Sequence, residues 1–159
     1  MILYHGGNIE VRVPAIMPVA RALDFGRGFY LTSDLDQASK WARTTALRRE
    51  CGVATVSFFE IDDDRYSKLK RMTFGGPTAE WLRFVMKNRV HCIEEVGYDV
   101  VSGPVANDNT MPVLNLYFKG AYNEEDAIKR LVAQKLRDQF AFKTEMALAC
   151  LEFVKAVAV

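Results

Sequence analysis

Two segments near the N-terminus carry the residue types that could bind a ligand. The first is Tyr4-His5-Gly6-Gly7, and the second runs from Asp24 to Thr32 (Asp-Phe-Gly-Arg-Gly-Phe-Tyr-Leu-Thr). A neutral imidazole donates a hydrogen bond from one ring nitrogen and accepts one at the other, which suits a ribose hydroxyl. The glycines that follow His5 lack side chains, so a ligand can approach the backbone there. Together the segments predict a pocket for a ligand with a planar part and a polar edge.

The second segment is the more specific of the two. Gly26 and Gly28 permit backbone conformations that other residues avoid, and Arg27 between them is expected to reach outward. On the short strand that follows, Phe29 and Tyr30 point to opposite faces, so one can pack in the core while the other faces a pocket. A glycine-rich hairpin with a buried aromatic ring explains this segment equally well. A dinucleotide fingerprint does not, because the third glycine and the long preceding strand are missing.

A late segment, Asp138 to Glu145, offers two further polar candidates. Gln139 lies on an expected strand, and Glu145 lies in the first turn of an expected helix. A carboxylate in that turn is favoured by the helix dipole alone, so a structural role for Glu145 is the simpler interpretation. His91 lacks a comparable setting and is interpreted as structural or exposed.

Composition limits the class of protein. The chain has 159 residues and a net charge of +1, which predicts one domain over residues 1–159 and no general attraction to nucleic acid or anionic membranes. Any nucleic-acid substrate would need a local site. No apolar run reaches the length of a membrane span, and the N-terminus does not resemble a signal peptide. We therefore expect a soluble cytoplasmic protein.

No metal site is expected either. Cys51, Cys92 and Cys150 are far apart, lack metal spacing and are interpreted as reduced core thiols. The three acids at 62–64 match no calcium-loop pattern and are interpreted as a solvated turn.

The pattern of apolar and turn residues predicts a mixed α+β fold. Strands are expected at 2–5, 29–32, 53–61, 98–103 and 138–142. Helices are expected from the Ser33 cap to about 49, after the breaker at 75–78, from the Asn123 cap to about 136, and from the Thr144 cap to the C-terminus. Residues 8–23 read as a loop, and 107–109 as a turn. Residues 114–118 fit strand or helix, and the apolar run 153–159 is interpreted mainly as a helix end packed on its own core.

Four blocks of the chain resemble the ADP-ribosyltransferase superfamily, and within it a bacterial group known as domain of unknown function 3990. The blocks occur in order along nearly the whole chain, which makes the resemblance more specific than any one of them. They are Tyr4-His5-Gly6, residues 24–32, residues 98–106 and residues 138–144. The resemblance implies a split mixed β-sheet with flanking helices around an NAD-binding cleft, with NAD as co-substrate and no metal.

The resemblance also implies roles for individual residues. In the histidine–tyrosine–glutamate branch of the superfamily, the histidine binds the adenosine ribose, the tyrosine stacks on nicotinamide, and the glutamate binds the nicotinamide ribose. By motif position these roles fall on His5, Tyr30 and Gln139, with Gly6 and Gly28 beside the cofactor and Arg27 at the pyrophosphate or simply exposed in a turn.

The third position departs from the pattern, because Gln139 is an amide and not a carboxylate. Cleavage of the nicotinamide–ribose bond develops positive charge on the ribose, which a carboxylate stabilises better than an amide dipole does. Three hypotheses remain open: a toxin or effector that transfers ADP-ribose to a protein or nucleic acid, a non-catalytic module that binds a nucleotide or a protein segment, and an NAD glycohydrolase. A neutralising antitoxin protein is a further expectation under the first.

Overall fold

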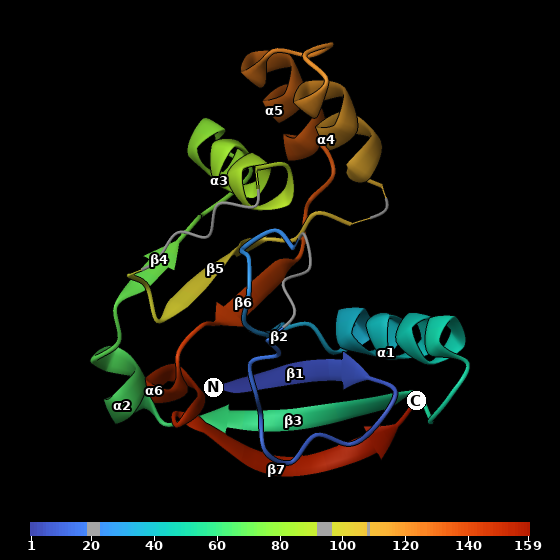
Figure 1. Cartoon of the computed structure of the whole chain (residues 1–159), viewed down its shortest axis with the longest axis vertical. Coiled ribbons are helices and arrows are strands. Elements are labelled where there is room, and N and C mark those ends of the chain that lie inside the picture. The colour runs from blue at the N-terminus through green and yellow to red at the C-terminus, as the bar shows by residue number, and fades with distance from the viewer. Residues whose placement is uncertain (19–22, 92–96, 108) are drawn as a thin grey trace.

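Seven strands of the described residues form two sheets in this computed structural model, which describes residues 1–18, 23–91, 97–107 and 109–159 (Figure 1). The first sheet is antiparallel, in the order β1-β3-β7. The second has the order β2-β6-β5-β4, in which only the β4–β5 pair is parallel. The strands are β1 (Ile2–Gly7), β2 (Phe29–Leu31), β3 (Thr55–Ile61), β4 (Arg71–Thr73), β5 (Val100–Pro104), β6 (Asp138–Phe142) and β7 (Leu151–Ala158).

A single antiparallel bridge joins the two sheets. The amide of Tyr4 donates to the carbonyl of Thr32 at 2.8 Å, and the amide of Thr32 donates to the carbonyl of Tyr4 at 3.0 Å. This bridge holds β1 beside β2. The two segments that were predicted to share a pocket are therefore neighbours in space.

Six helices of the described residues surround the sheets, so the expected mixed α+β class is confirmed. They are α1 (Leu35–Arg49), α2 (Asp63–Ser67), α3 (Ala79–Arg89), α4 (Met111–Phe118), α5 (Glu124–Val132) and α6 (Glu145–Leu148). Helix α1 contacts β1 and β3, whereas α5 contacts both α3 and α4 beyond the other sheet (Figure 1).

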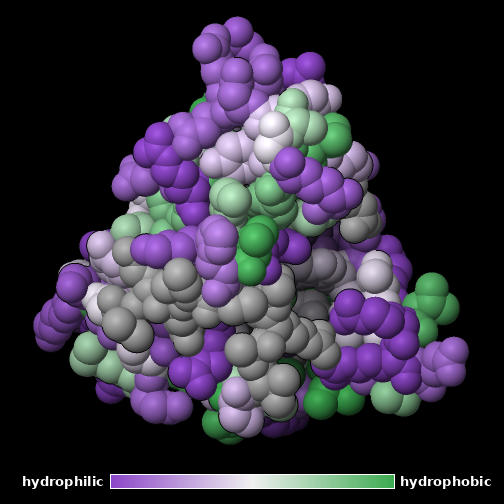
Figure 2. Space-filling model, turned by 45° about the horizontal axis from the view of Figure 1, so that its top comes forward, coloured by the Kyte–Doolittle hydropathy of each residue, from purple (hydrophilic) through white to green (hydrophobic). Residues whose placement is uncertain are grey.

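The core is divided between the two sheets. Phe29, Phe59 and Phe142 centre one cluster of buried side chains, and Phe25 and Trp81 belong to a second. A smaller cluster joins Ala38 and Ala42 of α1 to Val56 of β3. Among the coloured atoms in Figure 2, hydrophilic residues (purple) predominate, with small hydrophobic groups (green) between them. Burial of the aromatic rings on both sides of β6 fixes the position of that strand, and with it the neighbouring β2.

Several local predictions are confirmed with small shifts at the ends of elements. Strand β6 has the predicted bounds, whereas β1 continues through Gly7 and does not end at His5. Helix α1 is capped by Asp34, whose carboxylate accepts from the Gln37 amide at 2.9 Å, and not by Ser33. Residues 114–118 are helical, since they belong to α4.

The predicted C-terminal helix is wrong. Only Glu145–Leu148 is helical after the Thr144 cap, and the following residues form β7. The run 153–159 therefore pairs with β3 and does not end a helix. Valine residues favour extended backbone because their branched side chains are restricted in a helix, and β3 supplies the hydrogen-bonding partner that makes a strand possible.

Two smaller interpretations also need correction. Asp62 caps the short helix α2 through the Arg65 amide at 3.0 Å, so the three acids begin a helix and do not form a simple turn. Cys51 is exposed and is not a core thiol, whereas Cys150 is buried as expected. Cys92 and the middle of the predicted 107–109 turn lie outside the described residues.

Candidate functional site

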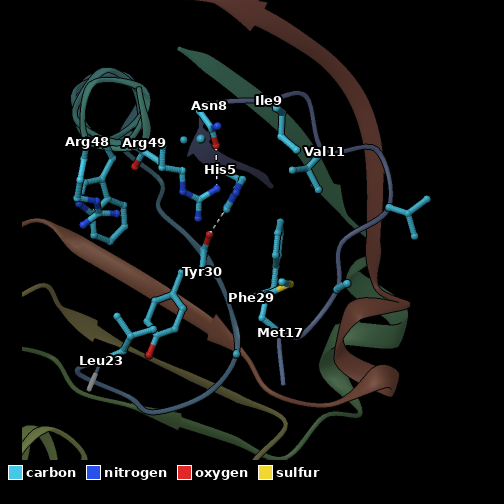
Figure 3. A pocket seen from close by; sticks show the side chains of 17 residues that line it. His5, Asn8, Ile9, Val11, Met17, Leu23, Phe29, Tyr30, Arg48 and Arg49 are labelled. Carbon is cyan, nitrogen blue, oxygen red and sulfur yellow. Dashed lines mark hydrogen bonds between the residues drawn. The ribbon is translucent and has the colours of Figure 1, made fainter. Parts of the chain in front are cut away.

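A pocket of about 470 Å³ opens where β1, β2, the segment of residues 8–17 and α1 meet (Figure 3). Four of the predicted site residues line it: His5, Gly6, Gly28 and Tyr30. Its volume is within the range of small-molecule sites, roughly 300–1,000 Å³. The structure thus places the two N-terminal segments around one cavity, as their residue types predicted.

His5 presents one ring nitrogen as an acceptor. Its Nδ1 lies 2.8 Å from the carbonyl oxygen of Tyr30. A carbonyl only accepts, so Nδ1 carries the proton and Nε2 of the neutral ring keeps a lone pair. The imidazole also stacks on Phe29, with ring centroids 4.5 Å apart, which fixes its plane.

The surroundings of His5 keep the imidazole neutral. Burial lowers the pKa of His5 below its ordinary value of 6.5, the charge of Arg49 lowers it further, and the hydrogen bond to Tyr30 opposes both. Figure 3 shows the guanidinium of Arg49 next to the ring. At neutral pH, His5 is therefore an acceptor for a ligand hydroxyl and not a cation.

We expect acid to destabilise the protein through His5. Because the pKa is lowered in the folded state, the unfolded chain binds more protons below about pH 6.5, so the free energy of unfolding falls as pH falls. Urea unfolding at pH 7.5 and pH 5.5 measures the effect, and the His5→Gln variant should lose part of the pH dependence. His91 is exposed, so the matched change His91→Gln should keep it. A wild-type pH dependence in His5→Gln would contradict this assignment.

Tyr30 is held in position through its hydroxyl group. The hydroxyl donates to the carbonyl of Gly26 at 2.6 Å and accepts from the amide of Phe25 at 3.1 Å. Lys143 donates to the carbonyls of Phe25 and Arg27 at 2.6 and 2.9 Å, which fixes the same turn from outside. The hydroxyl of Tyr30 therefore serves the turn, and its side chain packs against the cluster that contains Phe25 and Trp81, while the residue also lines the pocket.

The glycines of the two segments have different structural roles. A Cβ on Gly6 would lie 2.1 Å from the carbonyl oxygen of Ala38, so Gly6 is required where α1 packs on β1. A Cβ on Gly7 would meet His5 Nε2 at 3.5 Å, which is ordinary contact. Gly26 has φ of +74°, as expected for a glycine turn, and a Cβ on Gly28 would press on the Phe142 carbonyl at 3.0 Å. The glycine that leaves room in front of His5 is thus Gly7.

Two predicted site residues are not among those that line this pocket. Arg27 is exposed on the turn. Gln139 is 2% exposed, and its amide donates to Asp24 Oδ2 at 2.7 Å and to the Pro104 carbonyl at 3.3 Å. Glu145 is exposed on α6 and lies outside the pocket lining as well. The geometry gives Gln139 a buried structural contact in place of the ligand contact that was predicted for it.

Gln139 belongs to a buried polar network around Asp24. The Asp24 carboxylate is 3% exposed, forms an ion pair with Arg89 and accepts from the Ala106 amide at 2.8 Å. Three donors therefore surround one buried charge, which is the condition under which a buried carboxylate is tolerated. The network ties the start of the glycine turn to α3, β5 and β6.

Helix α1 contributes four pocket residues that the sequence reasoning missed: Trp41, Thr45, Arg48 and Arg49. Their spacing of i, i+4, i+7 and i+8 places them on one helical face, and this spacing was the available signal. Arg49 donates to the Asn8 side chain at 2.9 Å and so holds the loop after β1. The pocket therefore has two guanidinium groups at one wall, where the sequence had suggested Arg27.

The described lining of the pocket contains no Asp or Glu side chain. Elsewhere in the ranges that the structure describes, no group of three His, Cys, Asp or Glu residues is arranged to hold a metal ion. The pocket therefore combines a neutral acceptor, aromatic rings and positive charge, which suits a polar ligand with negative charge and a planar ring.

Comparison with known proteins gives one match. A family model described as a protein of unknown function, DUF3990, matches residues 1–153. The chain belongs to this family. No curated protein and no solved structure matches it. The DUF3990 match runs from β1 into the first three residues of β7, so the His5 pocket and all the other strands lie within the family region. Among the described helices, none is long and apolar enough to span a bilayer.

Proposed function

We propose that this DUF3990 protein binds NAD in the His5 pocket and transfers ADP-ribose to a macromolecular acceptor, as a toxin or effector in the cytoplasm. The observation that carries the proposal is the neutral His5, which presents Nε2 in the same cavity as the anchored ring of Tyr30. A ribose hydroxyl donates to Nε2, and the nicotinamide ring lies against Tyr30.

The positive wall of the pocket fits the pyrophosphate of NAD. Arg48 and Arg49 both line the cavity from the last turn of α1, and guanidinium groups match phosphate oxygens in geometry. Arg49 is already positioned by Asn8. Arg48 is therefore the better residue to replace in an experiment, because its replacement leaves the Arg49–Asn8 contact in place.

The strand arrangement also supports the proposal. The two sheets follow the order β4-β5-β6-β2 and β1-β3-β7, with only the Tyr4–Thr32 bridge between β2 and β1. The pocket lies at this division, which agrees with the split mixed sheet that the ADP-ribosyltransferase resemblance implies. His5 and Tyr30 come from the two strands that border it.

In the proposed reaction, the bond between the ribose C1′ and the nicotinamide nitrogen breaks, and nicotinamide leaves with the bonding electrons. A nucleophilic atom of the acceptor forms a new bond to C1′ and releases its proton. Within the described lining there is no carboxylate to stabilise the positive ribose, so orientation by His5 and Tyr30 and the reactivity of the acceptor supply most of the rate.

The lack of a carboxylate in the described pocket lining favours a second candidate, a module that binds NAD or another nucleotide without turnover. A pocket with an acceptor, aromatic rings and guanidinium groups holds such a ligand without any chemistry. Water as the acceptor would make the protein an NAD glycohydrolase, and its product would be free ADP-ribose.

We expect the protein to bind NAD, and Arg48→Gln to bind it about tenfold more weakly because one charged contact to phosphate is lost. Calorimetry measures the affinity, and chromatography of nicotinamide measures turnover in the presence of candidate proteins and nucleic acids. Arg43→Gln is the matched control, since Arg43 is an exposed arginine of α1 outside the pocket lining and should bind NAD like wild type.

The outcomes separate the hypotheses. Nicotinamide release with labelled acceptor supports transfer, release with free ADP-ribose supports hydrolysis, and binding without release supports the module. Absence of NAD binding at millimolar concentration contradicts the transferase, the glycohydrolase and the NAD-binding form of the module.

A further inference from the structure

A second cavity, of about 490 Å³, borders α1 next to the His5 pocket. It is lined by residues of α1 from Asp36 to Arg48 and, opposite them, by Val105, Ala106, Asn107, Asn109 and Arg137. Trp41 and Arg48 line both cavities. The two cavities are therefore neighbours, separated by side chains of one helix.

The described lining of this second cavity has more cations than carboxylates. It includes the cations Lys40, Arg48 and Arg137 and the carboxylate of Asp36. Arg137 also forms an ion pair with Asp34 at 2.6 Å, which fixes its guanidinium at the cavity edge and offsets part of its charge. Lys40 and Arg48 therefore carry most of the positive charge that a ligand would meet in this cavity.

An aromatic surface accompanies these cations. The indole of Trp41 is 39% exposed, which is unusual for a tryptophan, and it belongs to the lining. The amide side chains of Gln37, Asn107 and Asn109 are present in the same lining. A flat aromatic ring beside positive charge is the combination that binds single-stranded nucleic acid, because bases stack on the ring and phosphates pair with the cations.

We propose that this cavity binds a nucleotide unit of a single-stranded nucleic acid, with its base on Trp41 and its phosphate at Lys40 and Arg137. This site would identify the acceptor in the proposed function. It rests on that function for one point, namely that the bound nucleic acid accepts ADP-ribose. The shared wall at Trp41 and Arg48 places such an acceptor next to the NAD pocket.

An acidic protein segment is the alternative that the same cations would attract. The exposed indole favours the nucleic acid, because it offers a stacking surface for a base, and the Asn109 amide beside it offers a donor and an acceptor for a base edge. The Gln37 amide already donates to the Asp138 carbonyl, and the Asn107 side-chain oxygen already accepts from two backbone amides. A peptide of acidic residues has no aromatic ring to stack on the indole.

The test is a fluorescence titration with a ten-residue oligothymidylate at low salt and without NAD. The chain has two tryptophans, and Trp81 is 0% exposed, so Trp41 is the accessible reporter. Stacking on Trp41 is expected to quench the emission. Lys40→Gln should weaken binding about tenfold and reduce its salt dependence, since one phosphate contact is lost.

Arg43→Gln is the matched control, because Arg43 is exposed on α1 and lines neither cavity. The proposal is overturned if no quench occurs, if Lys40→Gln binds like Arg43→Gln, or if polyglutamate quenches Trp41 as well as the oligonucleotide does. Because NAD is absent, failure of the proposed transferase would leave this result intact: oligonucleotide binding without NAD cleavage would support the site and reject its role as acceptor site.

Discussion

Gln139→Glu is expected to lower the free energy of unfolding by about 3–5 kcal/mol at neutral pH, the cost typical of an uncompensated buried charge. The Gln139 amide donates to Asp24 at 2.7 Å, and both side chains are almost completely buried. A glutamate there would exchange this donor for a second carboxylate, and among the described residues Arg89 is the one cation paired with Asp24. Two neighbouring carboxylates in a buried site repel each other strongly.

Urea unfolding at pH 7 measures this effect, and Gln139→Met serves as the matched control. Methionine has a similar volume and removes the hydrogen bond without adding charge, so its cost should be smaller, about 1–3 kcal/mol. The double variant Asp24→Asn, Gln139→Glu again has one carboxylate and one amide. It should be more stable than Gln139→Glu alone.

The pH dependence provides a separate check. A buried glutamate beside Asp24 would have a raised pKa in the folded state, so the folded variant would bind more protons than the unfolded chain. Its stability deficit should therefore shrink as pH falls. Wild-type stability of Gln139→Glu at neutral pH would show that position 139 reaches solvent or a ligand, as the sequence had suggested.

The local parts of the fold were predictable because their signals lie within a few residues. The bounds of β6, the start of α3 after Thr78 and the Asn123 cap of α5 follow from alternation and capping chemistry. Strand β7 could not be predicted in the same way, because its hydrogen bonds go to β3, about 90 residues earlier in the chain. The short strand β4 was missed for the same reason, since it is defined by its parallel partner β5.

The candidate site shows the same difference between local signals and partners that lie far along the chain. His5 and Tyr30 were predicted to share a cavity from their residue types, and they do. Gln139 was assigned from motif position, but its contact is Asp24, which lies 115 residues away and has no local signature. Arg48 and Arg49 were missed because a helix face lines a cavity only where another element lies opposite it. Here the loop after β1 lies opposite α1, and the sequence of α1 does not show that placement.

The adjacent glycines after His5 allow binding to be separated from stability. Gly6→Ala is expected to destabilise the protein by about 3 kcal/mol, because its Cβ would lie 2.1 Å from the Ala38 carbonyl and would push α1 away from β1. Gly7→Ala should leave the stability unchanged or slightly higher, since its φ lies outside the left-handed region and its nearest contact is 3.5 Å away.

That nearest contact is His5 Nε2, and it decides the functional result. A hydroxyl that donates to Nε2 must approach within about 3 Å, and a methyl group on residue 7 would occupy part of that space. On the proposed function, Gly7→Ala should weaken NAD binding by about tenfold or more, with thermal unfolding close to wild type. Calorimetry with NAD measures the first and a melting curve the second. Unchanged affinity in a well-folded Gly7→Ala protein would mean that NAD does not use His5, because the variant alters the space in front of Nε2 and little else.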